Sequence, residues 1–293
     1  MGNTRLENGV GRVAIVTGAS SGIGAASARC LARAGFRVAT AARRAERLET
    51  LSKVIAREGG TILPVATDLA DERATNRLVE RTLDAFGRID VLVNNAGFSP
   101  AAALEQLTRS EVRDTFEVNL FAGLQLVGRV VPVMREQGGG RILNMSSLAG
   151  KVPAPLAVAY AATKGALESA TDCLRLELAP WRIRLSLIIP GFVDTPTFDN
   201  AREAARELRA DPTNPYRQLM LDLDDFATAQ LERALRPEDV GKIVLKAATA
   251  RRPRERYYVP FSARLQSSLL RSLPERVLDR LLIRLYKVPA ARA

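Results

Sequence analysis

The sequence of 293 residues contains no histidine and only two cysteines, Cys30 and Cys173. Without histidine, neither a Ser-His-Asp nor a Cys-His nucleophilic arrangement can be built. Two cysteines are also too few for a zinc site made of nitrogen and sulfur ligands, so we expect no metal. Proton transfer in this chain is therefore left to tyrosine, lysine, serine or a carboxylate.

Long apolar runs and a signal sequence are also lacking. No segment approaches the roughly 18 consecutive apolar residues of a membrane span, and the amino terminus, MGNTRLENGV, has no apolar core of the signal-peptide type. Both cysteines fall in apolar stretches of helical pattern, which predicts buried, reduced thiols rather than a disulfide. We therefore expect a cytoplasmic protein.

The chain alternates short β-rich runs with amphipathic helical stretches. The runs are VAIVTG (13–18), RVATAA (37–42), TILPVAT (61–67), DVLVNN (90–95), RILNMS (141–146), RLSLII (184–189) and YYVP (257–260). Because parallel strands need crossover connections, this alternation predicts an α/β fold, a doubly wound Rossmann-type parallel sheet of about seven strands. We assign residues 1–260 to this domain, 194–235 within it to a substrate lid, and 261–293 to a carboxyl-terminal extension.

Three glycines, Gly18, Gly22 and Gly24, follow the first strand in the sequence TGASSGIG. Missing side chains let the backbone approach a pyrophosphate, whose charge is stabilised by free N–H groups at a helix start. The spacing GxxxGxG differs from the common GxGxxG fingerprint, and an ordinary glycine-rich turn is the alternative. The position between the first strand and the first helix favours a dinucleotide site.

Tyr160 and Lys164 stand four residues apart in YAATK, and Ser147 lies thirteen residues before the tyrosine. Side chains at i and i+4 share a helix face, so the ammonium group can lie beside the phenol. A free tyrosine has a pKa of about 10, and a nearby positive charge favours its phenolate. The pair therefore predicts a tyrosine that donates a proton near neutral pH.

Asn119 falls on the apolar face of a predicted helix that also carries Phe116 and Val127. Asparagine is a poor helix former, and burying its amide unpaired costs about 1–3 kcal/mol. A cavity that offers polar partners or water is the better explanation. A structural asparagine packed against the sheet is the alternative.

These motifs, in their order, resemble the classical short-chain dehydrogenase/reductase family over roughly residues 11–260. The matching elements are TGASSGIG, Asp68-Leu69, Asn94-Asn95-Ala96-Gly97, Asn119, the Ser147/Tyr160/Lys164 set and Pro190-Gly191 with Thr195. Each element is weak alone, whereas the ordered set is specific. The resemblance implies hydride transfer with a nicotinamide cofactor, and a homo-oligomer, either a dimer or a tetramer.

The resemblance also implies roles for these residues. Tyr160 would be the general acid or base, Lys164 would hold the nicotinamide ribose and lower the tyrosine pKa, and Ser147 would hydrogen-bond the substrate oxygen. Asn119 would hold a water molecule in a proton relay. Ser146 is a rival for the serine role, but the family spacing selects Ser147. The predicted cofactor-binding residues are Gly18, Ser20, Ser21, Gly22, Ile23, Gly24, Arg43, Arg44, Asp68, Leu69, Asn95, Ala96, Gly97, Tyr160, Lys164, Pro190, Gly191, Val193 and Thr195.

Several of these residues have simpler structural explanations. Asn94 and Asn95 could be turn residues, and Asp68 could cap the helix that begins near Asp71. In the family, Asp68 would instead lie near the adenine, and the asparagine turn would adjoin the cofactor.

Cofactor choice depends on the end of the second strand, where Ala42 is followed by Arg43 and Arg44. NAD-dependent relatives place a carboxylate there to bind the ribose hydroxyl. A guanidinium can bind a 2′-phosphate through two hydrogen bonds, and the missing carboxylate removes a repulsion. We predict NADP in preference to NAD, with Arg43 the stronger candidate. The alternative is that Arg44 and Arg47 only face solvent.

The net charge of +11 is concentrated in residues 251–293, which hold eleven basic residues against three acidic ones. Within them, SLPERVLDRLLIRLYK (272–287) opens with the S-x-x-E pattern of a capping box and places leucines and arginines on opposite helical faces. An anionic membrane interface and packing on the domain or a second subunit are equal alternatives for this helix. Nucleic acid is not expected, because the segment has no recognised binding motif.

The sequence predicts an NADP-dependent oxidoreductase that interconverts a carbonyl and a secondary alcohol on a small, lipophilic substrate. Phe198, Leu219, Met220 and Phe226 of the insert are either walls of the substrate site or the core of the lid. The alternative function is a non-enzymatic NADP-binding protein that acts through its tail or at a membrane. The complete Tyr/Lys/Ser/Asn set favours the enzyme, because a sensor does not need it.

Overall fold

The computed structural model describes residues 9–289, so most of the amino-terminal stretch used for the signal-peptide prediction lies outside the described residues. Seven parallel strands form one sheet in the order β3-β2-β1-β4-β5-β6-β7. The strands are β1 (Val13–Thr17), β2 (Arg37–Ala42), β3 (Thr61–Ala66), β4 (Val91–Asn94), β5 (Gly140–Met145), β6 (Ile183–Pro190) and β7 (Arg256–Val259). Each lies within one residue of its predicted bounds, and the predicted fold class is confirmed.

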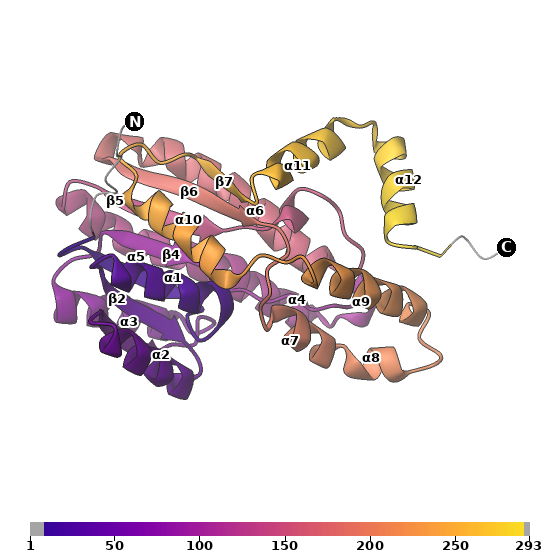
Figure 1. Ribbon diagram of the computed structural model, residues 1–293, viewed down its shortest axis with the longest axis horizontal. Helices are drawn as coiled ribbons and strands as arrows, with labels where there is room; N and C mark the ends of the chain where they lie inside the picture. Colours follow the sequence, from indigo (N-terminus) through magenta and orange to yellow (C-terminus); the bar gives the residue numbers. More distant parts are fainter. Residues whose placement is uncertain (1–8, 290–293) are drawn as a thin grey trace.

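Helices cover both faces of the sheet (Figure 1). Those between the strands are α1 (Gly22–Arg33), α2 (Ala45–Arg57), α3 (Glu72–Phe86), α4 (Arg109–Phe116), α5 (Ala122–Glu136), α6 (Val158–Glu177), α7 (Thr197–Ala204), α8 (Arg206–Ala210), α9 (Arg217–Leu231) and α10 (Pro237–Thr249). Helices α1, α2 and α10 contribute to the core on one face, and α3 and α5 contribute to the core on the other. The strand order reverses between β1 and β4, which places the expected ligand crevice beyond their carboxyl ends.

Helix α3 shows how local sequence sets the element ends. The side chain of Asp71 caps its first turn by accepting a hydrogen bond from the Arg73 amide at 2.8 Å. Gly87 ends it in the left-handed region, with φ of 74°. The alternative that Asp68 caps this helix is therefore wrong, because Asp71 does so.

Helices α4 and α5 are joined by a π-helical turn, η2 (Glu117–Phe121), into one run from Arg109 to Glu136. By length and composition this run could cross a membrane, although it contains no long stretch of consecutive apolar residues. In this structure it is a flanking helix, since Leu126, Val130 and Met134 are buried in the core against the sheet. Packing against the sheet therefore accounts for the apolar composition of this run.

The insert and the tail are helical. Residues 194–235 contain α7, α8 and α9, and the chain after β7 forms an arm of two helices, α11 (Ser262–Ser272) and α12 (Glu275–Leu285), which extends from the domain (Figure 1). The predicted capping box at Ser272 is wrong. Ser272 is the last residue of α11, where its hydroxyl donates to the Leu269 carbonyl at 2.7 Å, and Pro274 precedes α12 instead.

The cysteines are free, as predicted, but Cys173 is exposed and Cys30 only half-buried. The apolar pattern around Cys173 belongs to α6, and the thiol lies on the solvent side of that helix. The prediction that both thiols are buried is therefore wrong.

Candidate functional site

The glycine-rich turn joins β1 to α1. Gly18 and Gly22 have positive φ angles of 66° and 52°, which L-residues rarely adopt. A side chain on Gly24 would begin only 2.3 Å from the Gly18 carbonyl oxygen, so the turn folds tightly onto the helix start. The side chain of Ser21, the residue before α1, makes no capping hydrogen bond. The amides of the first turn are therefore suited to an anion.

Asn95 fastens this turn to the end of β4. Its side-chain amide donates to the carbonyl of Thr17 at 2.9 Å, and the Thr17 hydroxyl accepts from the backbone amides of Asn95 and Ala96 at 3.0 and 3.1 Å. The turn thus has a fixed shape. Asn94 lies deeper, with its amide bonded to Asn144 at 3.0 Å, and is a structural residue of the sheet.

Two further segments approach the glycine-rich turn from either side. Arg44 Nη2 donates to Ser20 Oγ at 3.1 Å, whereas Arg43 is exposed at the end of β2. From the other side, a side chain on Gly22 would begin 3.0 Å from the Thr195 methyl group. Asp68 is farther along the same edge of the sheet, where Oδ1 accepts from the Ala70 amide at 3.1 Å.

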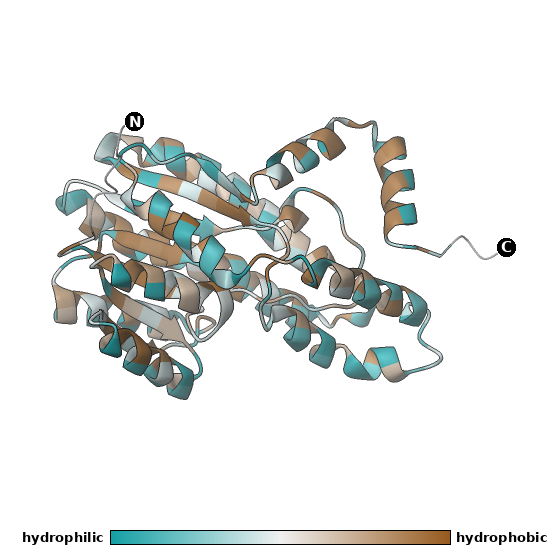
Figure 2. Cartoon of the chain, in the orientation of Figure 1, coloured by the Kyte–Doolittle hydropathy of each residue, from teal (hydrophilic) through white to brown (hydrophobic). Residues whose placement is uncertain are grey.

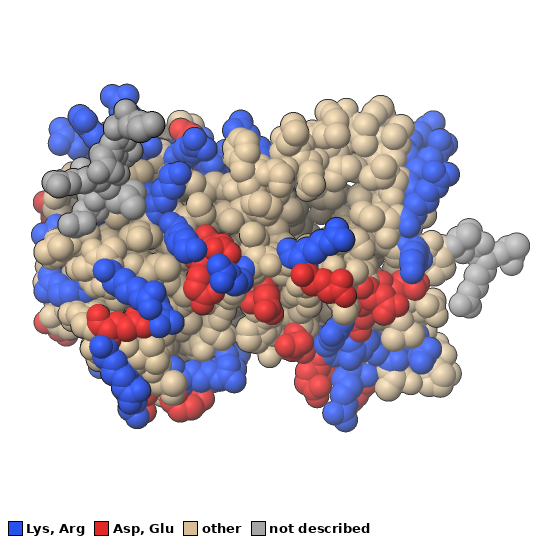
Figure 3. Space-filling model, viewed as in Figure 1, with Lys and Arg blue, Asp and Glu red and all other residues tan. Residues whose placement is uncertain are grey.

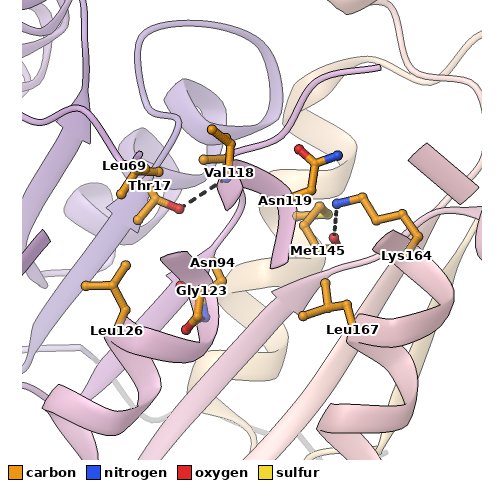
Figure 4. Close-up of a pocket in the computed structure, with 11 residues that line it drawn as sticks. Thr17, Leu69, Asn94, Val118, Asn119, Gly123, Leu126, Met145, Lys164 and Leu167 are labelled. Atoms are coloured by element: carbon orange, nitrogen blue, oxygen red, sulfur yellow. Dashed lines mark hydrogen bonds between the residues drawn. The ribbon is translucent and has the colours of Figure 1, made fainter. Parts of the chain in front are cut away.

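Tyr160, Lys164 and Ser147 come together at the carboxyl ends of β5 and β6. Helix α6 carries Tyr160 and Lys164, and the Lys164 Nζ lies 5.6 Å from the centre of the tyrosine ring. The ammonium also donates to the Met145 carbonyl at 2.8 Å, as Figure 4 shows. Ser147 follows β5 and hydrogen-bonds the Tyr160 phenol.

Asn119 lies inside the π-helical turn, where the backbone widens and the side chain turns towards the site. Its Oδ1 accepts from the Phe98 amide at 2.9 Å, and its Nδ2 donates to the Phe98 carbonyl at 2.8 Å and to Thr163 Oγ1 at 3.2 Å. The polar partners predicted for this buried amide are therefore present. A side chain on Gly97 would begin 3.1 Å from Asn119 Oδ1 and 3.5 Å from Lys164 Nζ, so these groups face the same loop.

A small cavity lies between these groups and the sheet (Figure 4). Its volume is about 10 Å³, which is room for one water molecule. The lining includes Thr17, Asn94, Asn119, Met145 and Lys164. Asn94 Oδ1 is buried without a hydrogen-bond partner among the described residues.

The predicted effect of Lys164 on Tyr160 is not seen. Burial raises the pKa of Tyr160 above its usual value, and the hydrogen bond with Ser147 only partly opposes this. Tyr160 as a whole residue is half-buried, whereas its phenol group is surrounded by protein. Burial also lowers the pKa of Lys164 to about 8. The spacing of Tyr160 and Lys164 is therefore not enough to lower the tyrosine pKa, and proton donation near pH 7 needs a further interaction that favours the phenolate.

The lowered pKa of Lys164 gives a testable dependence of stability on pH. Between pH 8 and its ordinary value of 10.5, the unfolded chain binds more protons at this site than the folded protein does. The free energy of unfolding should therefore rise with pH across this range. From pH 7 to pH 10, urea unfolding should show the wild type gaining about 2–3 kcal/mol relative to Lys164→Met. Lys242→Met, on the exposed side of α10, should show no such change. A constant difference between wild type and Lys164→Met would contradict the shifted pKa.

Sequence reasoning missed two groups of residues around the site. Behind Ser147, Glu168 accepts from Ser146 and pairs with Lys151. On the lid side, four aromatic rings pack in a row, which we call the aromatic row. They are Phe198, Phe192, Phe226 and Tyr286, with ring centres 5.6, 6.0 and 5.3 Å apart in turn. The sequence singles out only Phe198 and Phe226 of these rings, because the ring contacts join residues far apart in the chain.

Two of the four insert residues belong to the lid core, and a role as walls of the substrate site stays a prediction for the two phenylalanines. Leu219 and Met220 are buried within α9 and form lid core. Phe198 and Phe226 belong to the aromatic row, where both contact Phe192, which lies two residues after Pro190 at the end of β6.

Comparison with known proteins supports the family resemblance. Residues 12–206 match the family model described as short chain dehydrogenase. An uncharacterised oxidoreductase of Methylorubrum extorquens is 35% identical over 236 residues, covering 80% of this chain and 89% of that protein. Among solved structures, a metagenomic short-chain oxidoreductase in complex with NADP has a TM-score of 0.69 and 32% identity, covering 85% of this chain and 96% of the other. A 7α-hydroxysteroid dehydrogenase complexed with NADH and 7-oxo glycochenodeoxycholic acid has a TM-score of 0.73 and 25% identity, covering 85% and 91%.

Proposed function

Because the chain belongs to the short-chain dehydrogenase family, we propose that it is an NADP-dependent oxidoreductase acting on a carbonyl or secondary alcohol. The observation that carries this proposal is the meeting of Tyr160, Lys164, Ser147 and Asn119 beyond the carboxyl ends of the strands. NADPH, when bound, supplies the hydride. The chain must then supply a proton, a hydrogen bond to the substrate oxygen and a binding site that orients the substrate.

Each residue of the site has a distinct task in this proposal. Tyr160 donates a proton to the carbonyl oxygen during reduction and accepts it back during oxidation. Ser147 orients that oxygen through the hydroxyl that bonds to Tyr160. Lys164, with a pKa of about 8, is mostly protonated at pH 7 and offers hydrogen bonds to a ribose. Asn119 keeps the loop at Phe98 in place and borders the water-sized cavity, which suits it to a proton relay.

The residues present fit a dinucleotide with a 2′-phosphate. The tight turn at Gly18 and the uncapped start of α1 suit the pyrophosphate. Arg43 and Arg44 follow β2, whose last residue is Ala42 rather than a carboxylate, and Arg44 already contacts Ser20 of the turn. One solved relative holds NADP and another holds NADH, so the arginines support NADP more directly than the relatives do.

A lipophilic substrate is the proposal that the aromatic row supports. Phe192 follows β6 at the site, and the other three rings continue from it into the lid and the end of the arm. Rings in contact form an apolar surface that favours hydrophobic ligands. A solved relative is complexed with a steroid acid, which is such a ligand.

The proposed activity is tested by screening the purified protein with NADPH against lipophilic ketones and aldehydes. Loss of absorbance at the NADPH wavelength should be matched mole for mole by alcohol product. NADH should serve much less well. A protein that binds NADPH tightly but consumes none with any carbonyl compound would favour the alternative, a non-enzymatic NADP-binding protein.

We also propose that the arm contacts an anionic lipid surface. Seven large apolar side chains between Phe261 and Leu285 are exposed, including Leu265 at 74% and Leu269 at 63%. Residues 261–289 carry six basic side chains against Glu275 and Asp279. Figure 3 shows basic side chains along the outer edge of α12 beside a broad neutral surface, and Figure 2 shows both arm helices to be amphipathic. Such charge complements anionic headgroups, whereas two identical arms would repel each other.

Vesicle co-sedimentation tests this contact. The full chain should pellet with vesicles containing anionic lipid at low ionic strength, and less at high ionic strength. Replacing Arg276, Arg280 and Arg284 with glutamine should abolish most of the binding, since each basic group near the surface contributes about 1 kcal/mol. If a chain ending at Ser262 binds vesicles as well as the full chain but loses its oligomeric mass, the arm is a subunit interface and the membrane proposal is wrong.

A further inference from the structure

A buried carboxylate lies directly behind the segment that carries Ser147. Glu168 stands on α6, one helical turn after Lys164. Its Oε1 accepts from Ser146 Oγ at 2.8 Å, and its Oε2 lies 2.5 Å from Lys151 Nζ. Both side chains of the pair are only 9% exposed, which makes this the most enclosed ion pair among the described residues.

The two partners of Glu168 bracket Ser147. Ser146 is the residue before it, and Lys151 follows the short helix η3 (Leu148–Gly150) that comes after it. One carboxylate therefore ties both ends of segment 146–151 to the helix that carries Tyr160 and Lys164. The segment also touches α6 through Gly150, where a side chain would begin 3.0 Å from the Lys164 Cβ.

Stability alone is a poor explanation for this pair. Desolvating two charges offsets most of their attraction, and well-packed apolar side chains often stabilise a core as well or better. An ion pair instead fixes geometry, because each charged group holds the other at a set distance and orientation. Here that geometry includes the distance between Ser147 and Tyr160, which share a hydrogen bond.

We propose that Glu168 is a positioning residue, which holds the Ser147 segment against α6 through Ser146 and Lys151 and so aligns Ser147 with Tyr160. The proposal rests on the proposed oxidoreductase function. Small displacements of reacting groups cost about a hundredfold in rate. Glu168→Gln keeps the acceptor for Ser146 but loses the pair with Lys151. It should lower kcat at least tenfold while the Kd for NADPH changes less than threefold, because the glycine-rich turn lies elsewhere.

A double variant separates positioning from stability. Glu168→Gln and Lys151→Met each leave one buried charge unpaired, so both should lower Tm and kcat. Lys151→Met/Glu168→Gln removes both charges, and its Tm should recover towards that of the wild type. Its kcat should stay at least tenfold reduced, because residue 151 is no longer tied to α6. Lys151→Arg, which keeps the charge, should retain more activity than Lys151→Met.

Two results would overturn the proposal. One is a Glu168→Gln protein whose kcat lies within twofold of the wild type. The other is a double variant whose kcat recovers in step with Tm, which would make the pair purely structural. Arg88→Met is the matched control, since it breaks a 2.8 Å pair with Asp90 away from the site and should lower Tm without lowering kcat. A wild type that turns over no substrate would instead contradict the proposed function, before any variant is compared.

Discussion

Tyr160→Phe should lower kcat by about 10²–10⁴-fold while NADP(H) affinity stays within a few-fold. The variant removes only the hydroxyl that exchanges the proton and bonds to Ser147. The ring remains beside Lys164. Because the chain has no histidine, an imidazole cannot replace the phenol. Steady-state kinetics and calorimetric titration of the cofactor measure the two quantities.

Tyr258→Phe is the control for this variant, because Tyr258 lies on β7, the strand at the edge of the sheet. Its kcat should equal that of the wild type. If Tyr160→Phe keeps more than a tenth of the wild-type kcat, Tyr160 is not the essential acid.

Arg43→Ala should weaken NADPH binding about ten- to a hundredfold and leave NADH binding nearly unchanged. A guanidinium that binds the 2′-phosphate contributes on the order of 1.5–3 kcal/mol through charge-assisted hydrogen bonds. The same titrations with Arg44→Ala show how the two residues divide this task. Arg44 already bonds to Ser20 of the glycine-rich turn, so its loss should also weaken NADH binding slightly.

Arg47→Ala is the matched control for the arginine variants, because Arg47 is exposed in the first turn of α2. It should bind both cofactors as the wild type does. Equal losses for NADPH and NADH in Arg43→Ala, or no loss for either, would contradict the role assigned to Arg43.

The sheet and the glycine-rich turn could be predicted because their signals are local. Each strand is a short apolar run bounded by helical patterns, and the positive φ angles of Gly18 and Gly22 match residues that tolerate them. The tyrosine and lysine could be placed on one helix from their spacing alone. The sequence also indicated that Asn119 needs polar partners, which proved to be Phe98 and Thr163.

The features that were predicted wrongly or not at all depend on contacts between distant parts of the chain or on ambiguous sequence patterns. The pKa of Tyr160 is set by burial, which the spacing to Lys164 does not reveal. The pattern S-x-x-E at Ser272 also fits a serine that ends one helix before the next begins, and the structure has that arrangement. Nothing in the sequence distinguishes Glu168 from other polar residues of a helix, because its partners, Ser146 and Lys151, lie in a different segment of the chain.

Hydride transfer is the central claim, and NADPH deuterated at C4 of the nicotinamide tests it most directly. The wild-type protein is incubated with a ketone that the screen identifies, using each C4 epimer of the deuterated cofactor in turn. The account predicts that one epimer places a single deuterium on the carbinol carbon of the alcohol and that Tyr160→Phe forms almost none of this product. Product alcohol without deuterium from either epimer, or NADPH that is bound and never oxidised, would contradict it.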